Sequence, residues 1–380
     1  MQPVAAPAQR RVPRAASACP ARGFWETRFL TIAIPPSSSL QFPFPERPEI
    51  GATIEVAPGI IWLRLALPFR LDHVNVYLLE DGDGYAVVDT GIGDEPTTAH
   101  WQTLLDGPLR SRPVTKVIVT HFHSDHAGMA GWLCRTTGAP LLMSQTEYLT
   151  SLVLRLDPEA LEAEPYRSFY LNHGLAPDTT AKLLAHGHHY LRMLTGLPPT
   201  FRRLIAGETL QIGQRRFEVL SGGGHSPEQI MLYCEADHIL LAADQIMARI
   251  SPNISVQAMD PDGDPLGIYI RSLSNLKATL PEDVLVLPGH NLPFYGLHRR
   301  VDELLAHHVS RCDAIEAACA ESALTSAELV PVVFRRVIDD PHQMGFSFSE
   351  ALAHVNYMER QGRLVYADGR YRSAEPVSSA

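Results

Sequence analysis

The residues best suited to chemistry lie in one short stretch, where His121, His123, Asp125 and His126 follow the apolar residues 117–119. The β-branched sequence Val-Ile-Val predicts a buried strand that leads into a loop rich in metal-binding side chains. In an extended loop, His121 and His123 can point to the same side and share one metal ion. Asp125 and His126 would then face a neighbouring position, where a second ion could bind. The alternative, a solvated histidine-rich loop, does not explain why matching side chains recur downstream.

Side chains of the same kinds follow later apolar segments. His225 comes directly after the glycines at 222–224, which allow the backbone to pass close to a metal site. Asp244 lies just beyond a predicted strand at 239–242, and His290 follows another strand. Four separate loops therefore supply seven candidate ligands, namely His121, His123, Asp125, His126, His225, Asp244 and His290. Imidazole and carboxylate without thiolate suit zinc, and also iron or manganese.

Taken in order, these motifs resemble the signature of the metallo-β-lactamase superfamily. The resemblance covers roughly residues 50 to 300 and includes Asp89, which stands in the sequence Val-Val-Asp-Thr-Gly at the end of a predicted strand. It implies an α/β fold, the four-layer αββα sandwich of that superfamily. It also implies that Asp89 supports the metal ligands from a second layer, as ligating imidazoles generally require. Otherwise, Asp89 is a simple turn former. The motifs are specific for fold and metal but almost silent on substrate.

The resemblance further implies two divalent metal ions, with zinc as the first choice and iron or manganese as alternatives. His121, His123 and His225 would bind one ion, Asp125, His126 and His290 the other, and Asp244 would bridge them. An open coordination position for water marks a catalytic site, and a water shared by two cations loses its proton near neutral pH. The implied reaction is hydrolysis. Asp244 and Asp125 are the predicted catalytic carboxylates, Asp125 because it can also help to move the proton.

Composition limits the class of protein. A chain of 380 residues is long for one domain, and 45% hydrophobic with 19% charged residues indicates an ample core. The net charge of −10 argues against a nucleic-acid or anionic-membrane surface. Five scattered cysteines without a CxxC pair predict reduced thiols in a cytoplasmic protein. No apolar run is long enough to span a bilayer.

We expect three parts along the chain. Residues 1–48 predict an unfolded tail, because they are rich in proline and alanine and carry four arginines before Glu26, the first acidic residue. A targeting segment, a disordered tail and a misassigned start are the three interpretations. Residues 49–300 form the metal-binding domain. A helical insertion at about 145–205 is expected to build the pocket wall and to set substrate specificity.

Periodicity and turn residues place the elements of the metal-binding domain. Strands are predicted at 54–56, 60–65, 74–79, 85–89, 141–143, 211–220 (a hairpin), 230–233, 239–242 and 284–287, and helices at 97–109, 129–134, 147–156, 179–194 and 269–280. In the insertion, His186, His188 and His189 lack the i, i+4 spacing of a helical metal site, so a surface or pocket-wall role is favoured.

The residues from 301 to 375 are expected to form a separate α+β domain. After a helix at 301–319, the residues Thr325–Glu328 and Ser347–Glu350 both match the capping-box pattern that begins a helix. A hairpin with an Asp-Gly turn follows at 363–371. This order of elements resembles a winged-helix-like module, which some members of the superfamily carry at this end.

The predicted substrate is a small ester, thioester or lactone. Phe294, Tyr295 and His298 follow His290 closely and are candidates to line the pocket, although Phe294 is an equally good core residue. The basic residues that a glutathione thioesterase needs are not evident in a matching stretch.

Two other classes of function fit the sequence less well. Some superfamily members with a winged-helix-like tail are endoribonucleases, but residues 301–380 hold seven arginines and no lysine against twelve acidic residues. Phosphate binding depends on lysine and arginine, so nucleic acid is a poor partner for this module. A non-catalytic binding protein would have lost ligands, yet all seven are present. We expect the acidic module instead to cover the metal domain or to mediate a homodimer.

Overall fold

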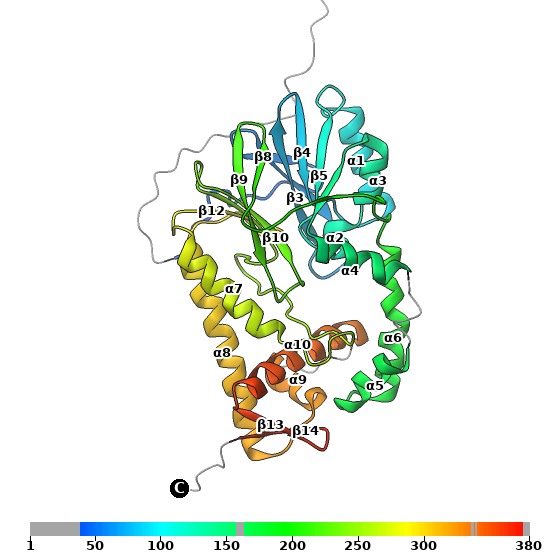
Figure 1. The fold of residues 1–380 in the computed structure, drawn as a ribbon, viewed down its shortest axis with the longest axis vertical. Coiled ribbons are helices and arrows are strands. Elements are labelled where there is room, and N and C mark those ends of the chain that lie inside the picture. The colour runs from blue at the N-terminus through cyan, green and yellow to red at the C-terminus, as the bar shows by residue number, and fades with distance from the viewer. Residues whose placement is uncertain (1–38, 157–162, 336–337, 339, 375–380) are drawn as a thin grey trace, which may run out of the picture.

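The computed structural model describes residues 39–156, 163–335, 338 and 340–374, and it contains two β-sheets packed face to face (Figure 1). The first sheet comprises β1 (Thr53–Ala57), β2 (Ile60–Ala66), β3 (His73–Asp81), β4 (Gly84–Val88), β5 (Val114–Ile118), β6 (Leu141–Met143) and β7 (Arg202–Arg203), in that order. The second sheet has the order β12 (Leu285–Pro288), β11 (Ile239–Ala243), β10 (Gln229–Cys234), β9 (Arg215–Gly222) and β8 (Thr209–Ile212).

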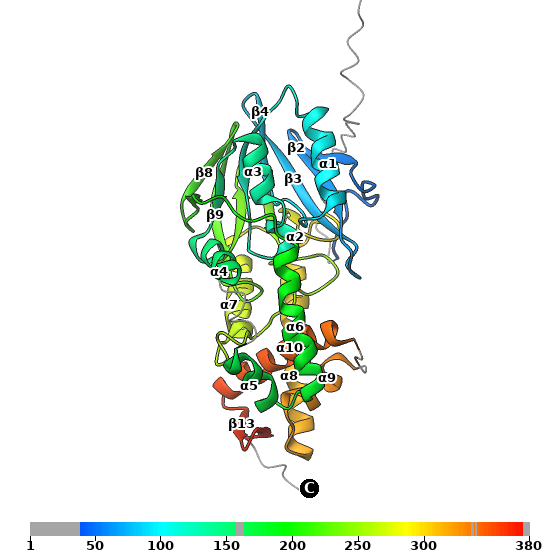
Figure 2. The ribbon, with the colours of Figure 1, turned by 90° about the vertical axis from the view of Figure 1, so that its right-hand side faces the viewer.

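Helices cover the outer faces of both sheets, and residues 301–374, called the C-terminal unit below, are mostly helical (Figure 2). The helices are α1 (Glu95–Asp106), α2 (Ser124–Ala127), α3 (Ala130–Thr137), α4 (Gln145–Leu156), α5 (Glu164–Asn172), α6 (Pro177–Arg192), α7 (Pro265–Thr279), α8 (Leu297–Glu321), α9 (Ser326–Phe334) and α10 (Pro341–Arg360).

Strand β2 shows how the sequence fills both faces of its sheet. Ile61, Leu63 and Leu65 pack in the cluster that contains side chains of α1 and α3. Ile60 and Trp62 instead pack between the two sheets. Successive side chains of a strand point to opposite faces, so a nearly continuous apolar strand is buried on both.

The second sheet is covered on its outer face by α7 and α8. Helix α7 connects β11 to β12, which pair in parallel, and such a pair needs a crossover connection. Leu240 of β11, Leu273 of α7 and Val301 of α8 share one buried cluster. The layers are therefore helices, sheet, sheet and helices, and the predicted four-layer αββα fold is confirmed.

The insertion is helical, as predicted, and connects two regions of the molecule. Phe169 of α5 and Leu175 lie in the same buried cluster as Phe348 of α10. The backbone N–H of Ala327 donates to the carbonyl of His173 at 3.2 Å. Figure 2 shows α6 running from the sheets down to α5, beside α10. Helix α6 includes His186, His188 and His189, whose side chains lie outside the described part of the structure.

One of the two predicted capping boxes is present and the other is wrong. Helix α9 begins with Thr325 as its N-cap, and reciprocal hydrogen bonds join Thr325 and Glu328. Ser347, by contrast, lies inside α10, which already begins at Pro341 with Asp340 as its N-cap. Proline at the first turn after an aspartate is the stronger start signal, because its missing N–H costs nothing there.

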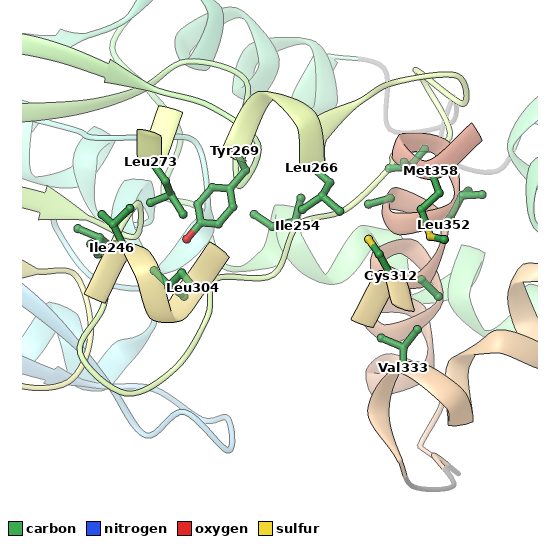
Figure 3. Close-up of a cluster of buried hydrophobic side chains, with 14 of the residues drawn as sticks. Ile246, Ile254, Leu266, Tyr269, Leu273, Leu304, Cys312, Val333, Leu352 and Met358 are labelled. Atoms are coloured by element: carbon green, nitrogen blue, oxygen red, sulfur yellow. The ribbon is translucent and has the colours of Figure 1, made fainter. Parts of the chain in front are cut away.

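The C-terminal unit is completed by the predicted hairpin, β13 (Leu364–Ala367) and β14 (Arg370–Ser373), and it shares a core with the metal-binding domain. Cys312 of α8 and Leu352 of α10 belong to the same cluster as Tyr269 of α7 (Figure 3). The predicted boundary at residue 300 falls within the continuous helix α8. The division into 49–300 and 301–375 thus remains a proposal.

Residues before the predicted boundary at 49 already contact the domain. Gln41 and Tyr295 exchange two backbone hydrogen bonds, of 3.1 and 2.9 Å, and the side chains of Leu40 and Phe42 pack against the core. Residues 39–48 are therefore in contact with the domain, a correction to the predicted tail, while residues 1–38 lie outside the described residues. In the part of the chain described, no helix has the length and apolar character to cross a membrane.

Candidate metal centre

The seven predicted ligands meet at one edge of the sheets, because each follows the end of a strand. The histidines at 121 and 123 follow β5, Asp125 and His126 lie on α2, and the remaining three follow β9, β11 and β12. Three overlapping groups have their ligand atoms within 4.8 Å of one another: His121 with His123 and His225, His121 with His126 and Asp244, and Asp125 with His126 and His290. The structure thus brings all seven together, and their assignment as ligands remains our proposal.

Three imidazole nitrogens converge in the first group. Nδ1 of His123 lies 3.0 Å from Nε2 of His121 and 3.0 Å from Nε2 of His225. Nitrogen ligands at about 2.0–2.1 Å from a tetrahedral zinc are roughly 3.3 Å apart, so the spacing is close to that of a shared cation. Burial lowers the pKa of His121, and burial together with the neighbouring His225 lowers the pKa of His123 to about 3. Neutral rings can offer lone pairs to a metal.

Asp244 lies between the three-histidine group and the group of Asp125, His126 and His290. Its Oδ2 is 3.4 Å from Nε2 of His225 and 3.3 Å from Nε2 of His290, and its Oδ1 is 3.5 Å from Nε2 of His126. Oδ2 of Asp125 lies 3.3 Å from Nε2 of His290. Among the described residues, His126 Nε2 and Asp244 Oδ1 are buried without a hydrogen-bond partner. Buried polar atoms are normally satisfied, and a divalent cation would satisfy both, so this donor set fits a metal.

Opposite charges dominate the group of Asp125, His126 and His290 beside Asp244. Burial acts to lower the pKa of His290, but the carboxylates of Asp244 and Asp125 outweigh it and raise this pKa to about 10. The pKa of His126 is raised in the same way. Burial acts to raise the pKa of Asp125 and of Asp244, yet the neighbouring imidazoles lower both. The two carboxylates stay ionised and attract positive charge, as a metal ion requires of its ligands.

Asp89 lies directly behind these ligands. Its Oδ2 accepts hydrogen bonds from Nδ1 of His126 at 2.7 Å and from Oγ1 of Thr120 at 2.9 Å, and its Oδ1 accepts the Thr120 N–H at 2.8 Å. Oγ1 of Thr120 is in turn 3.0 Å from Nδ1 of His121. Asp89 adopts a left-handed φ of 62°, a conformation that is uncommon for non-glycine residues and clusters at functional sites. One carboxylate therefore orients His126 directly and His121 through Thr120.

The loop that carries His290 is anchored to β3, which sequence reasoning missed. Nδ1 of His290 donates to the carbonyl of His73 at 2.7 Å, and the N–H of Asn291 donates to Nε2 of His73 at 3.0 Å. Nδ2 of Asn75 donates to the carbonyls of Pro288 and Asn291, each at 2.9 Å. The available signal was a lone asparagine in an apolar strand, since such a buried amide needs partners.

Glu147 of α4 joins the two loops that carry the three-histidine group. One carboxylate oxygen accepts the N–H of Phe122 at 2.9 Å, and the other accepts the Ser226 hydroxyl at 2.8 Å and the N–H of Glu228 at 2.6 Å. Burial raises the pKa of Glu147, although these hydrogen bonds oppose the rise. The sequence predicts a helix here without distinguishing Glu147, because its partners lie 25 to 81 residues away and leave no local pattern.

The three candidate pocket residues lie in different surroundings. Phe294 is fully buried in the core beside α7 and α8, so it fills the structural role that the sequence left open. Tyr295 is partly buried against the cluster between the sheets. Nε2 of His298 lies 2.7 Å from the carbonyl of Leu280, and its Nδ1 lies 3.1 Å from Oε2 of Glu282. A substrate contact by Tyr295 or His298 stays a prediction.

Two stretches of the chain match known protein families. Residues 69–290 match the Metallo-beta-lactamase superfamily. Residues 312–374 match the family described as Metallo-beta-lactamase-like, C-terminal domain.

Individual proteins resemble the chain over different lengths. A crystal structure of a beta-lactamase domain protein from Burkholderia ambifaria is 39% identical, with a TM-score of 0.81, over 88% of this chain and 98% of the other. The "Probable metallo-hydrolase YqjP" of Bacillus subtilis is 22% identical over 80% of this chain and 92% of its own length. The "Atrochrysone carboxyl ACP thioesterase" of Passalora fulva is 29% identical over 23% of this chain and 26% of its own length.

Proposed function

We propose that two divalent ions act together on a small ester, thioester or lactone in this protein. The chain belongs to the metallo-β-lactamase superfamily and is a metal-dependent hydrolase. The position of Asp244 carries this proposal, since its two carboxylate oxygens lie within 3.5 Å of imidazole nitrogens from both ligand groups. A carboxylate placed in this way favours two ions at close spacing, which is typical of hydrolytic sites.

The seven residues divide naturally between two ions. His121, His123 and His225 would hold one, Asp125, His126 and His290 the other, and Asp244 would be shared. When bound, such ions polarise a substrate carbonyl and lower the pKa of water towards neutrality. Zinc is the first choice for imidazole and carboxylate ligands, with iron and manganese as alternatives.

Residues of the chain orient the ligands and can accept a proton. The second ring nitrogen of four imidazoles has a hydrogen-bond partner: His121 with Thr120, His126 with Asp89, His225 with the carbonyl of Asn253, and His290 with the carbonyl of His73. Asp125 is the more exposed of the two central carboxylates, at 19% against 7% for Asp244. It is therefore better placed to accept a proton from a water molecule that enters the site.

The insertion supports a small, partly apolar substrate. A groove of about 330 Å³ on α4 is lined by Leu149, Val153, Met259 and Arg203, among others. It also includes Thr146, whose N–H bonds to Oε2 of Glu228, three residues beyond His225. Apolar walls with a single cation suit the acyl part of a thioester or ester. The partial match to a protein named as a thioesterase supports the same class.

The C-terminal unit would be winged-helix-like in its order of helices and hairpin, yet three of its seven arginines pair with acidic side chains. Arg311 pairs with Glu350, Arg363 with Glu316, and Arg370 with Glu328. Arginines paired in this way are poorly placed to contact phosphates, so the unit supports the metal domain rather than nucleic-acid binding.

The proposal is tested by metal analysis of the purified full-length protein, followed by a panel of thioester, lactone, ester, β-lactam and phosphodiester substrates. We expect close to two transition-metal ions per chain and turnover of the first three classes. Asp244→Ala should abolish turnover and release metal, because the shared carboxylate is lost. Asp237→Ala serves as the control, since Asp237 pairs with Arg215 at the surface.

Replacing His290 or Asp125 should remove mainly one of the two ions. A folded wild-type protein that binds no transition metal after zinc or iron supplementation would falsify the proposal.

A further inference from the structure

The loop between β11 and α7 reaches from the metal centre to the C-terminal unit. At its near end, Nδ1 of His225 donates a hydrogen bond to the carbonyl of Asn253 at 2.8 Å. This bond fixes the tautomer of His225 and turns its Nε2 towards His123 and Asp244, at 3.0 and 3.4 Å. The orientation of this imidazole therefore depends on where the backbone of Asn253 lies.

Asn253 is held in turn by α10. Its Nδ2 donates to Oε2 of Glu350 at 2.9 Å and to the carbonyl of Phe346 at 3.3 Å. The N–H of Val256 donates to the carbonyl of Ser349 at 3.2 Å. Three hydrogen bonds thus fix this loop to one face of α10. Among them, the bond to Glu350 holds Asn253, the residue whose carbonyl contacts His225.

Glu350 is itself fixed from a second helix. It is only 5% exposed, and its Oε1 forms an ion pair with Arg311 of α8. A buried carboxylate of this kind is stable when it is both paired and hydrogen-bonded, and loss of one partner is costly. The Glu350 carboxylate therefore cannot readily move away from Asn253.

Apolar packing holds the same loop in place. Ile254 is fully buried and belongs to the cluster that contains Leu266 of α7 and Leu352 of α10. Figure 3 shows Ile254 and Leu266 between the group around Tyr269 and the side chains of the C-terminal helices. The shared core thus fixes the residue after Asn253, so a shift of α10 would also move the Asn253 carbonyl, which accepts the hydrogen bond from His225.

We propose that Glu350 is a positioning residue for the metal centre, through which the C-terminal unit sets the orientation of His225. The inference rests on the proposed function and deepens it. It gives the C-terminal unit a role in metal binding that does not require it to touch substrate. The chain of contacts runs from Arg311 through Glu350 and Asn253 to His225.

The test compares metal affinity with stability in the full-length protein. Glu350→Gln removes the charge, so one amide cannot accept from both Arg311 and Asn253, and Asn253→Ala removes the side chain that α10 holds while leaving the carbonyl. Each should weaken binding of one of two ions by about 10- to 100-fold, measured with zinc against a chelator. The second ion should bind as in the wild type. Cobalt-substituted protein should show altered absorption bands, which stability alone does not change.

Two controls separate positioning from stability. Glu316→Gln removes a carboxylate from another arginine pair of the same unit, with Arg363, at a site that does not contact the loop. It should lower the melting temperature without changing zinc affinity. Glu350→Gln combined with Asn253→Ala should weaken zinc binding no more than either change alone, because both break one pathway.

The outcomes distinguish this inference from its premise. Wild-type protein that binds two ions, together with Glu350→Gln and Asn253→Ala variants of unchanged zinc affinity, overturns the inference and leaves the proposed function intact. Additive losses in the double variant also overturn it. Wild-type protein that binds no metal overturns the proposed function first. Should Glu350→Gln fail to fold, Asn253→Ala carries the same test, since its change lies in the loop.

Discussion

At the scale of single residues, the candidate metal centre depends on side chains that do not bind metal. Asp89 contacts both His126 and Thr120, and Glu147 contacts the loops on either side of the three-histidine group. Imidazole ligands need such partners, because the hydrogen bond on one nitrogen sets the tautomer and direction of the other. A change at Asp89 should therefore act mainly through His126, and on His121 only through Thr120, whereas a change at Glu147 should act on the three-histidine group.

Asp89→Asn should weaken mainly the ion held by Asp125, His126 and His290, because Asp89 bonds His126 directly and reaches His121 only through Thr120. Asparagine has a single acceptor oxygen, so its NH₂ group would face either the Thr120 N–H or the two donors that now share Oδ2, His126 Nδ1 and Thr120 Oγ1. We expect zinc affinity at that position to fall by about 10- to 100-fold, measured by chelator competition. Asp94→Asn is the matched control, because Asp94 caps α1 and an asparagine cap is equivalent. Equal zinc affinity for Asp89→Asn and the wild type would contradict the assigned role.

Glu147→Gln should weaken the ion held by the three histidines. The carboxylate accepts three hydrogen bonds with its two oxygens, and a glutamine amide would direct N–H groups at one set of donors. Metal analysis should show one retained ion, with a melting temperature lowered by several degrees. Glu164→Gln on α5, where the exposed carboxylate accepts a hydrogen bond from Ser168 one turn along the helix, should behave as the wild type. Retention of two tightly bound ions in Glu147→Gln would show that other contacts fix these loops.

At the scale of elements, the predictable features were those written locally in the sequence. Apolar alternation placed the strands, the Asp-Gly pair placed the hairpin, and Asp368 and Gly369 indeed have φ of 51° and 76°. The ligand loops were predictable because each ligand follows a strand. Ser347 and Glu350 show the limit, since a pattern that fits a helix start occurs inside α10. Glu350 instead accepts a hydrogen bond from Asn253, 97 residues away. A local sequence pattern cannot predict such a distant contact.

A pair of buried histidines joins α8 to α10 and makes stability depend on pH. Nδ1 of His308 lies 3.2 Å from Nε2 of His354, and Nδ1 of His354 donates to the carbonyl of Glu350 at 2.7 Å. Burial, with His354, His307 and Arg311 nearby, lowers the pKa of His308 to about 2. Burial likewise lowers the pKa of His354 to about 3, and Tyr269 of α7 packs edge-on against His308.

Because these pKa values are lower in the folded state than the usual 6.5, the unfolded chain binds more protons in acid. Stability contributed by the neutral pair is therefore complete above about pH 6.5 and is lost as pH falls towards 3. The loss is about 1.4 kcal/mol per pH unit for each imidazole. His308→Leu with His354→Leu should flatten the dependence of the unfolding free energy on pH between 6.5 and 4. Denaturant titrations with a chelator present keep the metal ligands in the same state in both proteins, and parallel curves would contradict the prediction.

At the scale of the whole molecule, the two sheets, the insertion and the C-terminal unit form one body around the metal centre. The insertion contributes Glu147 and the groove on α4, and the C-terminal unit contributes the contacts to the Asn253 loop. The sequence predicted each part but not the packing between the parts, because the core that they share contains residues from Phe169 to Tyr371. Packing between segments so far apart depends on the complete fold and has no signature in any single stretch.

The charge of the whole molecule predicts its behaviour towards nucleic acid. The chain carries a net charge of −10, and three of the seven arginines in residues 301–380 are paired with acidic side chains, which weakens phosphate binding. Because such contacts dominate affinity and are strongest at low salt, single-stranded RNA should bind weakly even at low ionic strength. Fluorescence anisotropy with labelled RNA tests binding, and gel analysis tests cleavage, which should be slow compared with thioester turnover.

As a positive control, Asp313→Lys with Glu316→Lys frees Arg363 and should raise RNA affinity. The small-molecule assignment would be wrong if the protein cleaved RNA efficiently, lost this activity in Asp244→Ala, and hydrolysed none of the esters and thioesters. The proposed metal centre would be unaffected by that result.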